Sequence, residues 1–153
     1  LWGRCGSVWY RVSELYFDSR AKQRQMTDEE YAAALEKLAG RRQITAVIVD
    51  PSAASFIAVL RKRGWRVQKA VNEVLSGIRR TSDCLKEGRI VICQDCADCL
   101  REMDEYVWDL SSGAKDRVKK EHDHAMDDMR YFVSTVLREG NTAVAACSVE
   151  RKT

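Results

Sequence analysis

The chain has 153 residues, of which 45% are hydrophobic and 32% charged, and this size suits one domain built around one core. The net charge of +3 results from 26 basic and 23 acidic residues, so composition alone gives little support for a polyanionic partner. No apolar run is long enough to cross a membrane and no signal peptide is recognisable, which argues against a membrane or secreted protein. The six cysteines are therefore expected to be reduced thiols in a cytosol.

The N-terminal part of the chain predicts a strand followed by a helix. Residues 7–17, SVWYRVSELYF, are rich in aromatic and β-branched side chains, which favour a strand. Thr27 and Glu30 form a capping-box pattern that begins a helix ending near Gly40. The predicted inner face of this helix consists of Tyr31, Leu35 and Leu38.

A second strand and helix are predicted directly afterwards. Residues 44–50, ITAVIVD, are almost continuously apolar, which is typical of a strand buried on both faces of a sheet. The run ends in the carboxylate of Asp50. A helix over 52–63 follows, with Pro51 near its first turn and Gly64 as its stop.

The rest of the chain continues the alternation of strands and helices. The predicted strands cover 65–70 and 89–93, and the predicted helices cover 72–87, 95–108 and 121–140. Asn72 is the expected cap of the first of these helices. Its expected inner face consists of Val74, Ile78, Thr81 and Leu85. The alternation indicates an α/β layered fold.

Residues 119–131, KKEHDHAMDDMRY, contain both histidines of the chain. On a helix, Asp123 and Asp127 would be neighbours four residues apart, and His124 and Asp128 would form a second such pair. The expected apolar arc consists of Met126, Met129, Phe132, Val133, Val136 and Leu137. Two interpretations remain open: an acidic first turn that favours the positive end of the helix dipole, or a metal site.

The metal interpretation requires a further ligand, and Asp50 is a candidate. It follows an apolar strand, at the kind of sheet edge where open α/β sheets bind their ligands. Hard ions such as Mg²⁺ or Mn²⁺ prefer oxygen ligands, and Mn²⁺ also accepts an imidazole. An alternative metal site is CQDCADC, residues 93–99, whose three thiols would need a fourth ligand. The same cysteines also fit the inner stripe of a helix, where thiols act as small hydrophobes.

Several motifs resemble the nuclease domain of the large terminase subunit of tailed bacteriophages. They are YFDSRAKQRQMTDEEYAAAL, IVDPSAASFIAVLRKRGW, NEVLSGIRRTSDCLKEGRIVI, EYVWD and DHAMDDMRYF, in the family's order from Tyr16 to Phe132. The resemblance implies a ribonuclease H-like α/β fold, with a central mixed sheet flanked by helices. It also implies that this single domain, residues 1–153, begins after the family's first strand, and no ATPase phosphate loop is found.

In this family three acidic positions hold two metal ions, Mg²⁺ or Mn²⁺. The resemblance assigns Asp50 and Asp123 to the second and third positions, with His124 as an adjoining ligand and Asp127 following on the same helical face. The aspartate of the first position has no match in this chain. The implied activity is metal-dependent endonucleolytic cutting of concatemeric viral DNA during packaging, and absence of that aspartate puts cleavage by this chain in doubt.

The implied partners are double-stranded DNA, the terminase ATPase domain, the small terminase subunit and the portal, in the cytoplasm of a bacterial host. Basic residues that could contact phosphates are Lys69, Arg79, Arg80, Lys119 and Lys120, although they also suit a solvated surface. The alternative function is a non-catalytic DNA-binding or capsid-docking remnant of a decayed prophage terminase. A cysteine-ligated metal protein is a third possibility.

Overall fold

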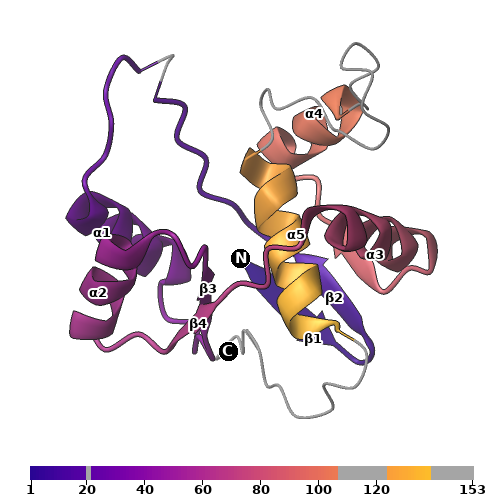
Figure 1. The fold of residues 1–153 in the computed structure, drawn as a ribbon, viewed down its shortest axis with the longest axis horizontal. Helices are drawn as coiled ribbons and strands as arrows, with labels where there is room; N and C mark the ends of the chain where they lie inside the picture. Colours follow the sequence, from indigo (N-terminus) through magenta and orange to yellow (C-terminus); the bar gives the residue numbers. More distant parts are fainter. Residues whose placement is uncertain (20–21, 107–123, 139–153) are drawn as a thin grey trace.

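The computed structural model describes residues 1–19, 22–106 and 124–138, in which strands and helices alternate (Figure 1). The strands are β1 (Trp2–Cys5), β2 (Val8–Arg11), β3 (Val47–Val49), β4 (Val67–Lys69) and β5 (Ile90–Ile92). The helices are α1 (Asp28–Ala39), α2 (Ala54–Lys62), α3 (Val74–Lys86), α4 (Ala97–Glu105) and α5 (His124–Val136). The predicted mixed α/β class is confirmed. In the described part of the chain, no helix has the length and hydropathy that a membrane span requires.

The strands form two separate sheets. β2 pairs with β1 antiparallel and with β5 parallel, in the order β1-β2-β5, whereas β3 pairs with β4 in parallel. The expected single central sheet is therefore wrong for the described residues. Each sheet packs against α5, which lies in the centre of the molecule (Figure 1).

α5 fills the larger of two hydrophobic cores. Phe132 stacks on Trp2 of β1 with ring centroids 4.1 Å apart and meets Trp9 of β2 edge to face at 5.2 Å. The arc predicted for this helix is confirmed as its packing face, with Val133 fully buried. Ile48 of β3 packs against the same core, so α5 joins the two sheets.

The smaller core lies between α1, α2 and the β3–β4 sheet. Val49 is buried there with Leu60 of α2, on the opposite side of β3 from Ile48. The prediction of a strand covered on both faces is thus confirmed. α1 begins as predicted, because both hydrogen bonds of the capping box between Thr27 and Glu30 are present.

Three local predictions are wrong. The strand predicted over 7–17 ends at Arg11, because the chain beyond it turns so that Glu14 can accept hydrogen bonds from the start of α4. Asn72 does not cap α3, whose N-cap is Glu73 and has no side-chain cap bond. The inner face predicted for α3 is wrong at Val74, which is 46% exposed, whereas Thr81 is buried and Leu85 packs against the core as predicted. The buried side also contains Gly77 and Cys84, because it faces α5 and β5.

Candidate metal centre

Asp50 follows β3 and is held by three donors. Its Oδ1 accepts hydrogen bonds from Ser52 N at 2.8 Å and from Ser52 Oγ at 2.7 Å, so the Asp-Pro-Ser turn closes on its own carboxylate. Its Oδ2 accepts a hydrogen bond from the Tyr131 hydroxyl of α5 at 2.6 Å. The bonds from Tyr131 and Ser52 hold the pKa of Asp50 below its usual value, so the carboxylate is ionised at neutral pH.

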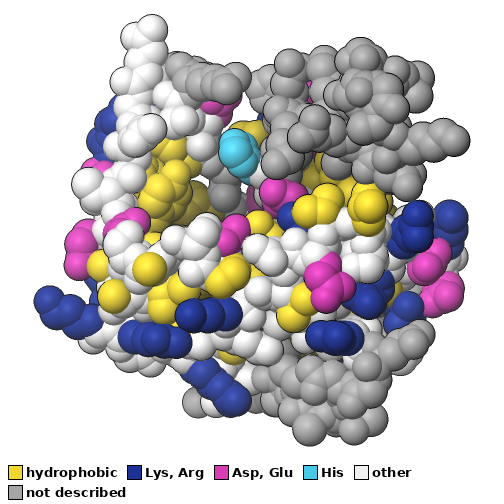
Figure 2. All heavy atoms as spheres, in the orientation of Figure 1, with side chains coloured by type: hydrophobic (Ala, Val, Ile, Leu, Met, Phe, Trp, Pro, Cys, Tyr) yellow, Lys and Arg dark blue, Asp and Glu magenta, His cyan; other side chains and the backbone are white. Residues whose placement is uncertain are grey.

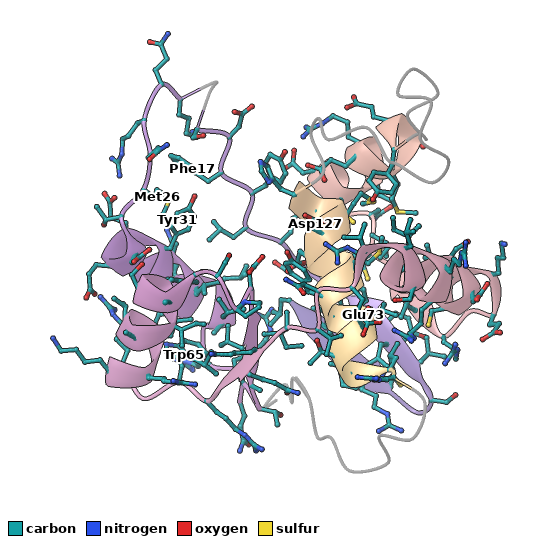
Figure 3. All side chains as sticks on the ribbon, viewed as in Figure 1. Phe17, Met26, Tyr31, Trp65, Glu73 and Asp127 are labelled. Atoms are coloured by element: carbon teal, nitrogen blue, oxygen red, sulfur yellow. The ribbon has the colours of Figure 1, made fainter. Side chains whose placement is uncertain are left out.

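Next to Asp50, Arg130 ties α5 to the connection between β4 and α3. This buried guanidinium donates to the carbonyl oxygens of Asn72 at 2.9 Å and Glu73 at 3.2 Å, and to Asp127 Oδ1 at 2.7 Å. Figure 3 shows Asp127 on α5 and Glu73 on the neighbouring connection. Asp127 is therefore held by Arg130, a cation that lies one turn further along the same helix.

The carboxylate of Asp50 is the kind of ligand that a hard divalent ion prefers. A carboxylate has about four lone-pair positions, and three donors leave Oδ2 of Asp50 with one position for a metal. His124 is exposed at the start of α5. Figure 2 shows histidine, in cyan, on a face that also carries acidic side chains, in magenta. Within the described ranges, no group of three metal-ligating side chains is assembled. Asp123, the expected central ligand of α5, lies outside these ranges.

The start of α5 is held from a neighbouring helix. Glu102 of α4 is fully buried, and its Oε2 accepts hydrogen bonds from Ala125 N at 2.6 Å and Met126 N at 3.3 Å. Its Oε1 accepts a hydrogen bond from the Tyr16 hydroxyl at 2.7 Å. Glu14 likewise accepts a hydrogen bond at the start of α4, from Asp98 N at 2.7 Å.

Asp128 belongs to a different cluster from Asp50. Its Oδ2 lies 2.5 Å from Nη1 of Arg11, a buried cation of β2 that also lies 3.5 Å from Glu14. The pairing expected between His124 and Asp128 would therefore compete with the ion pair between Asp128 and Arg11 of β2. Asp128 links α5 to β2.

The candidate phosphate-binding residues are dispersed. Lys69 is exposed on β4, Arg79 is exposed on α3, and Arg80 is half-buried on α3. Figure 2 shows other basic side chains over the part of the surface formed by α2 and β4. Lys119 and Lys120 lie outside the described residues.

The cysteines of residues 93–99 behave as core residues. Cys96 and Cys99 are fully buried, and Cys96 Sγ donates to the Arg11 carbonyl at 3.4 Å. Burial raises the pKa of Cys96, and it raises the pKa of Cys99 to about 11. Both thiols are therefore protonated at neutral pH, whereas a metal needs thiolates.

Sequence reasoning missed four residues that shape the centre: Ser52, Glu102, Arg130 and Tyr131. The turn over Asp50 and Ser52 has a local signal, since Asp two positions before Ser favours a bond to the backbone. Arg130 and Tyr131 appeared only as part of a resembling motif. Glu102 carries no local signal, because its partners lie on another helix.

A model of the family described as "Terminase RNaseH-like domain" matches residues 12–135, which is most of the chain. The match includes the described elements from α1 to α5 and both Asp50 and Asp127. The chain belongs to the terminase RNaseH-like domain family. The resemblance to the terminase nuclease domain is thereby confirmed.

Individual terminases agree with this assignment. The solved large terminase of a thermophilic bacteriophage, in complex with ADP, is 42% identical, with a TM-score of 0.86 over 89% of this chain and 35% of that chain. A second crystal form of the same terminase gives a TM-score of 0.83. The large terminase subunit of Escherichia phage T5 is 24% identical over 135 residues, 84% of this chain and 31% of that protein. This terminase domain thus spans about a third of the length of these relatives.

Proposed function

We propose that this terminase domain is a divalent-metal-dependent endonuclease that cuts double-stranded viral DNA during packaging. The observation that carries the proposal is the ionised Asp50 carboxylate, oriented by Tyr131 and Ser52 with one lone pair left for a metal. Membership of the terminase RNaseH-like domain family and similarity to large terminases of bacteriophages support the substrate class.

In this proposal Asp50, Asp123 and His124 hold Mg²⁺ or Mn²⁺. Two such ions, when bound, would supply an activated water and stabilisation of the departing 3′ oxygen of the phosphodiester. Tyr131 and Ser52 keep Asp50 charged and in one orientation. Arg130 donates to Asp127 Oδ1 and so holds this carboxylate in place on α5, one turn before Arg130.

An additional strand between the two sheets is part of this proposal. Among the described strands, β1 pairs only with β2 and β3 pairs only with β4, while Trp2 and Ile48 on these strands both reach the core built on α5. A strand inserted between β1 and β3 would join the sheets into one mixed sheet. A carboxylate on that strand would supply the first acidic position of the family.

The DNA would be bound mainly through its phosphates, which carry no base identity, so cutting would depend little on sequence. Lys69, Arg79 and Arg80 are the described candidates for these contacts, together with Lys119 and Lys120. In a complete large subunit, an ATPase domain, the small subunit and the portal would be the protein partners, in the cytoplasm of a bacterial host.

Cleavage of supercoiled plasmid in Mg²⁺ or Mn²⁺ tests the proposal. The expected result is nicked and linear DNA with a large terminase subunit that contains this domain and the additional strand, none with Asp50→Ala in that subunit, and wild-type products with Asp104→Ala, an exposed carboxylate on α4. Plasmid that stays intact while it is retarded by the protein in a gel would contradict the nuclease. That result would support the alternative, a non-catalytic DNA-binding remnant of a prophage terminase.

A further inference from the structure

Positive charge is concentrated in the part of the chain that forms the smaller core. No other Asp or Glu lies between Glu36 and Asp50 or between Asp50 and Glu73, whereas these two stretches contain three and five basic residues, respectively. The net charge of the whole chain is only +3, so this excess of basic residues is local.

The parallel pairing of β3 with β4 brings several of these cations to one edge of their sheet. Val47 pairs with Val67, and Val47 N donates to Arg66 O at 2.8 Å, so the two strands begin side by side. α2 ends at Lys62, only four residues before Arg66. Figure 2 shows Lys and Arg side chains, in dark blue, over this part of the surface. We call the exposed cations that precede the two strands the basic edge: Arg41, Arg61, Lys62 and Arg66.

The side chains of the basic edge take part in no salt bridge within the described residues. Arg63 shows the contrast, because its guanidinium lies 2.6 Å from Glu29 and 3.0 Å from Glu36 of α1. The helix dipole favours cations in the last turn of α2, but its effect falls off within that turn and does not explain Arg66. Like charges gathered at one edge repel one another, so this surface attracts an anion.

The chemistry of the basic edge suits the phosphates of a duplex. Double-stranded DNA carries one charge per about 1.7 Å of its axis, so cations at separate positions can each meet a phosphate. Three of the four cations are arginines, whose planar guanidinium binds two phosphate oxygens at once. Surfaces for single strands add aromatic rings on which bases stack. Trp65, which precedes Arg66, instead packs against the smaller core (Figure 3).

The basic edge lies at the opposite end of the β3–β4 sheet from Asp50. β3 begins at Val47, beside Arg66, and Asp50 follows its last residue. Three steps of about 3.3 Å along the strand make this separation about 10 Å. A duplex advances by about 3.4 Å per base pair, so about three base pairs cover the same length. One duplex is therefore long enough to reach the basic edge and Asp50 together.

We propose that the basic edge, formed by Arg41, Arg61, Lys62 and Arg66, is a phosphate-binding surface that holds double-stranded DNA at the end of the β3–β4 sheet opposite Asp50. This inference rests on the proposed function, because it takes duplex DNA as the polyanion. The basic edge adds affinity that does not depend on base sequence, since phosphates carry no base identity.

Fluorescence anisotropy of a labelled duplex of about 20 base pairs tests the inference at several salt concentrations. EDTA is present, so that no metal contributes and no DNA is cut. The wild-type chain is compared with a triple variant, Arg61→Gln, Lys62→Gln and Arg66→Gln. Each lost phosphate contact lowers the slope of log affinity against log salt concentration by about 0.9, so the triple variant is expected to lose about 2–3 of this slope. Near about 0.1 M salt it is expected to bind about 10-fold more weakly.

A matched control removes the same number of charges from exposed cations elsewhere: Arg4→Gln, Lys22→Gln and Lys86→Gln. Its affinity is expected to stay within about twofold of the wild type, because these residues lie outside the basic edge. An equal loss in this control would reduce the effect to net charge and would overturn the inference.

Equal affinity and equal salt dependence of the triple variant and the wild-type chain would also overturn the inference, and would point to an acidic protein surface as the partner of the basic edge. That result would leave the proposed nuclease standing. Uncut plasmid in the cleavage assay, with duplex binding weakened in the triple variant alone, would overturn the nuclease and leave this inference standing. Should the triple variant not fold, Arg66→Gln alone decides: it must lower the slope by about one, and an unchanged slope would overturn the inference.

Discussion

Tyr131 donates its phenolic hydrogen to Asp50 at 2.6 Å, which connects the end of β3 to α5 across 81 positions of the chain. The bond orients the carboxylate and lowers the pKa of Asp50. Burial and the same bond raise the pKa of Tyr131 to about 12, so the phenol remains a donor throughout the neutral range.

Replacing Tyr131 by Phe removes this donor while keeping the ring. We expect Tyr131→Phe to lower the free energy of unfolding by about 1–2 kcal/mol, since a hydrogen bond to a charged group is lost. Urea unfolding measures the change. Tyr31→Phe on α1 is the matched control, because Tyr31 makes ring contacts with Phe17 and Phe56, and it should differ by less than about 0.5 kcal/mol. Equal effects of both variants would contradict the role of the bond.

Arg130 should matter more for stability than its carboxylate partner. Arg130→Met leaves the carbonyl oxygens of Asn72 and Glu73 without this donor, and we expect it to cost about 2–3 kcal/mol. The side chain of Asp127 is 38% exposed, so Asp127→Asn should cost less than about 1 kcal/mol. Thermal unfolding of both variants provides the comparison. A larger loss with Asp127→Asn would show that the ion pair, and not the carbonyl contacts, holds Arg130.

Gly77 allows α3 and α5 to approach closely. A Cβ at this position would lie 2.7 Å from Arg130 Cγ and 3.0 Å from Ser134 Oγ, both on a buried face of α5. Gly77→Ala is therefore expected to destabilise by about 1–3 kcal/mol, although Ala is the better helix former. Chemical denaturation tests this, with Leu75→Ala at a position 39% exposed on the same helix as the control. A Gly77→Ala variant more stable than the wild-type chain would mean that α3 and α5 can move apart without a cost in free energy.

The raised pKa of Tyr16 predicts that the protein loses stability at alkaline pH. Burial and the hydrogen bond to Glu102 raise its pKa from 10.0 to about 12. A group whose pKa is raised by folding contributes stability that is complete below the unfolded value and is lost as pH rises through the folded value. The advantage of the wild-type chain over Tyr16→Phe should therefore be constant from pH 7 to about 10 and shrink towards pH 12. Unfolding midpoints measured across this range decide, and an advantage that persists above pH 12 would contradict the assignment.

Local patterns in the sequence correctly indicate much of the fold. The capping box of Thr27 and Glu30 is satisfied within four residues, and the apolar arc of α5 follows from helical periodicity. The same logic placed Asp50 at the end of a buried strand. These features depend on neighbours along the chain, so one sequence is enough to predict them.

Only the tertiary structure decided what surrounds Asp50. The strand that begins at Val8 is shorter than predicted because Glu14 accepts hydrogen bonds at the start of α4. The contact between α3 and α5 decides which face of α3 is buried. Tyr131 reaches Asp50, and Glu102 reaches Ala125, through packing between elements distant in sequence. Local periodicity therefore determined the elements and the carboxylate that follows β3, whereas long-range packing decided which donors hold that carboxylate and which side chain of α4 accepts hydrogen bonds from α5.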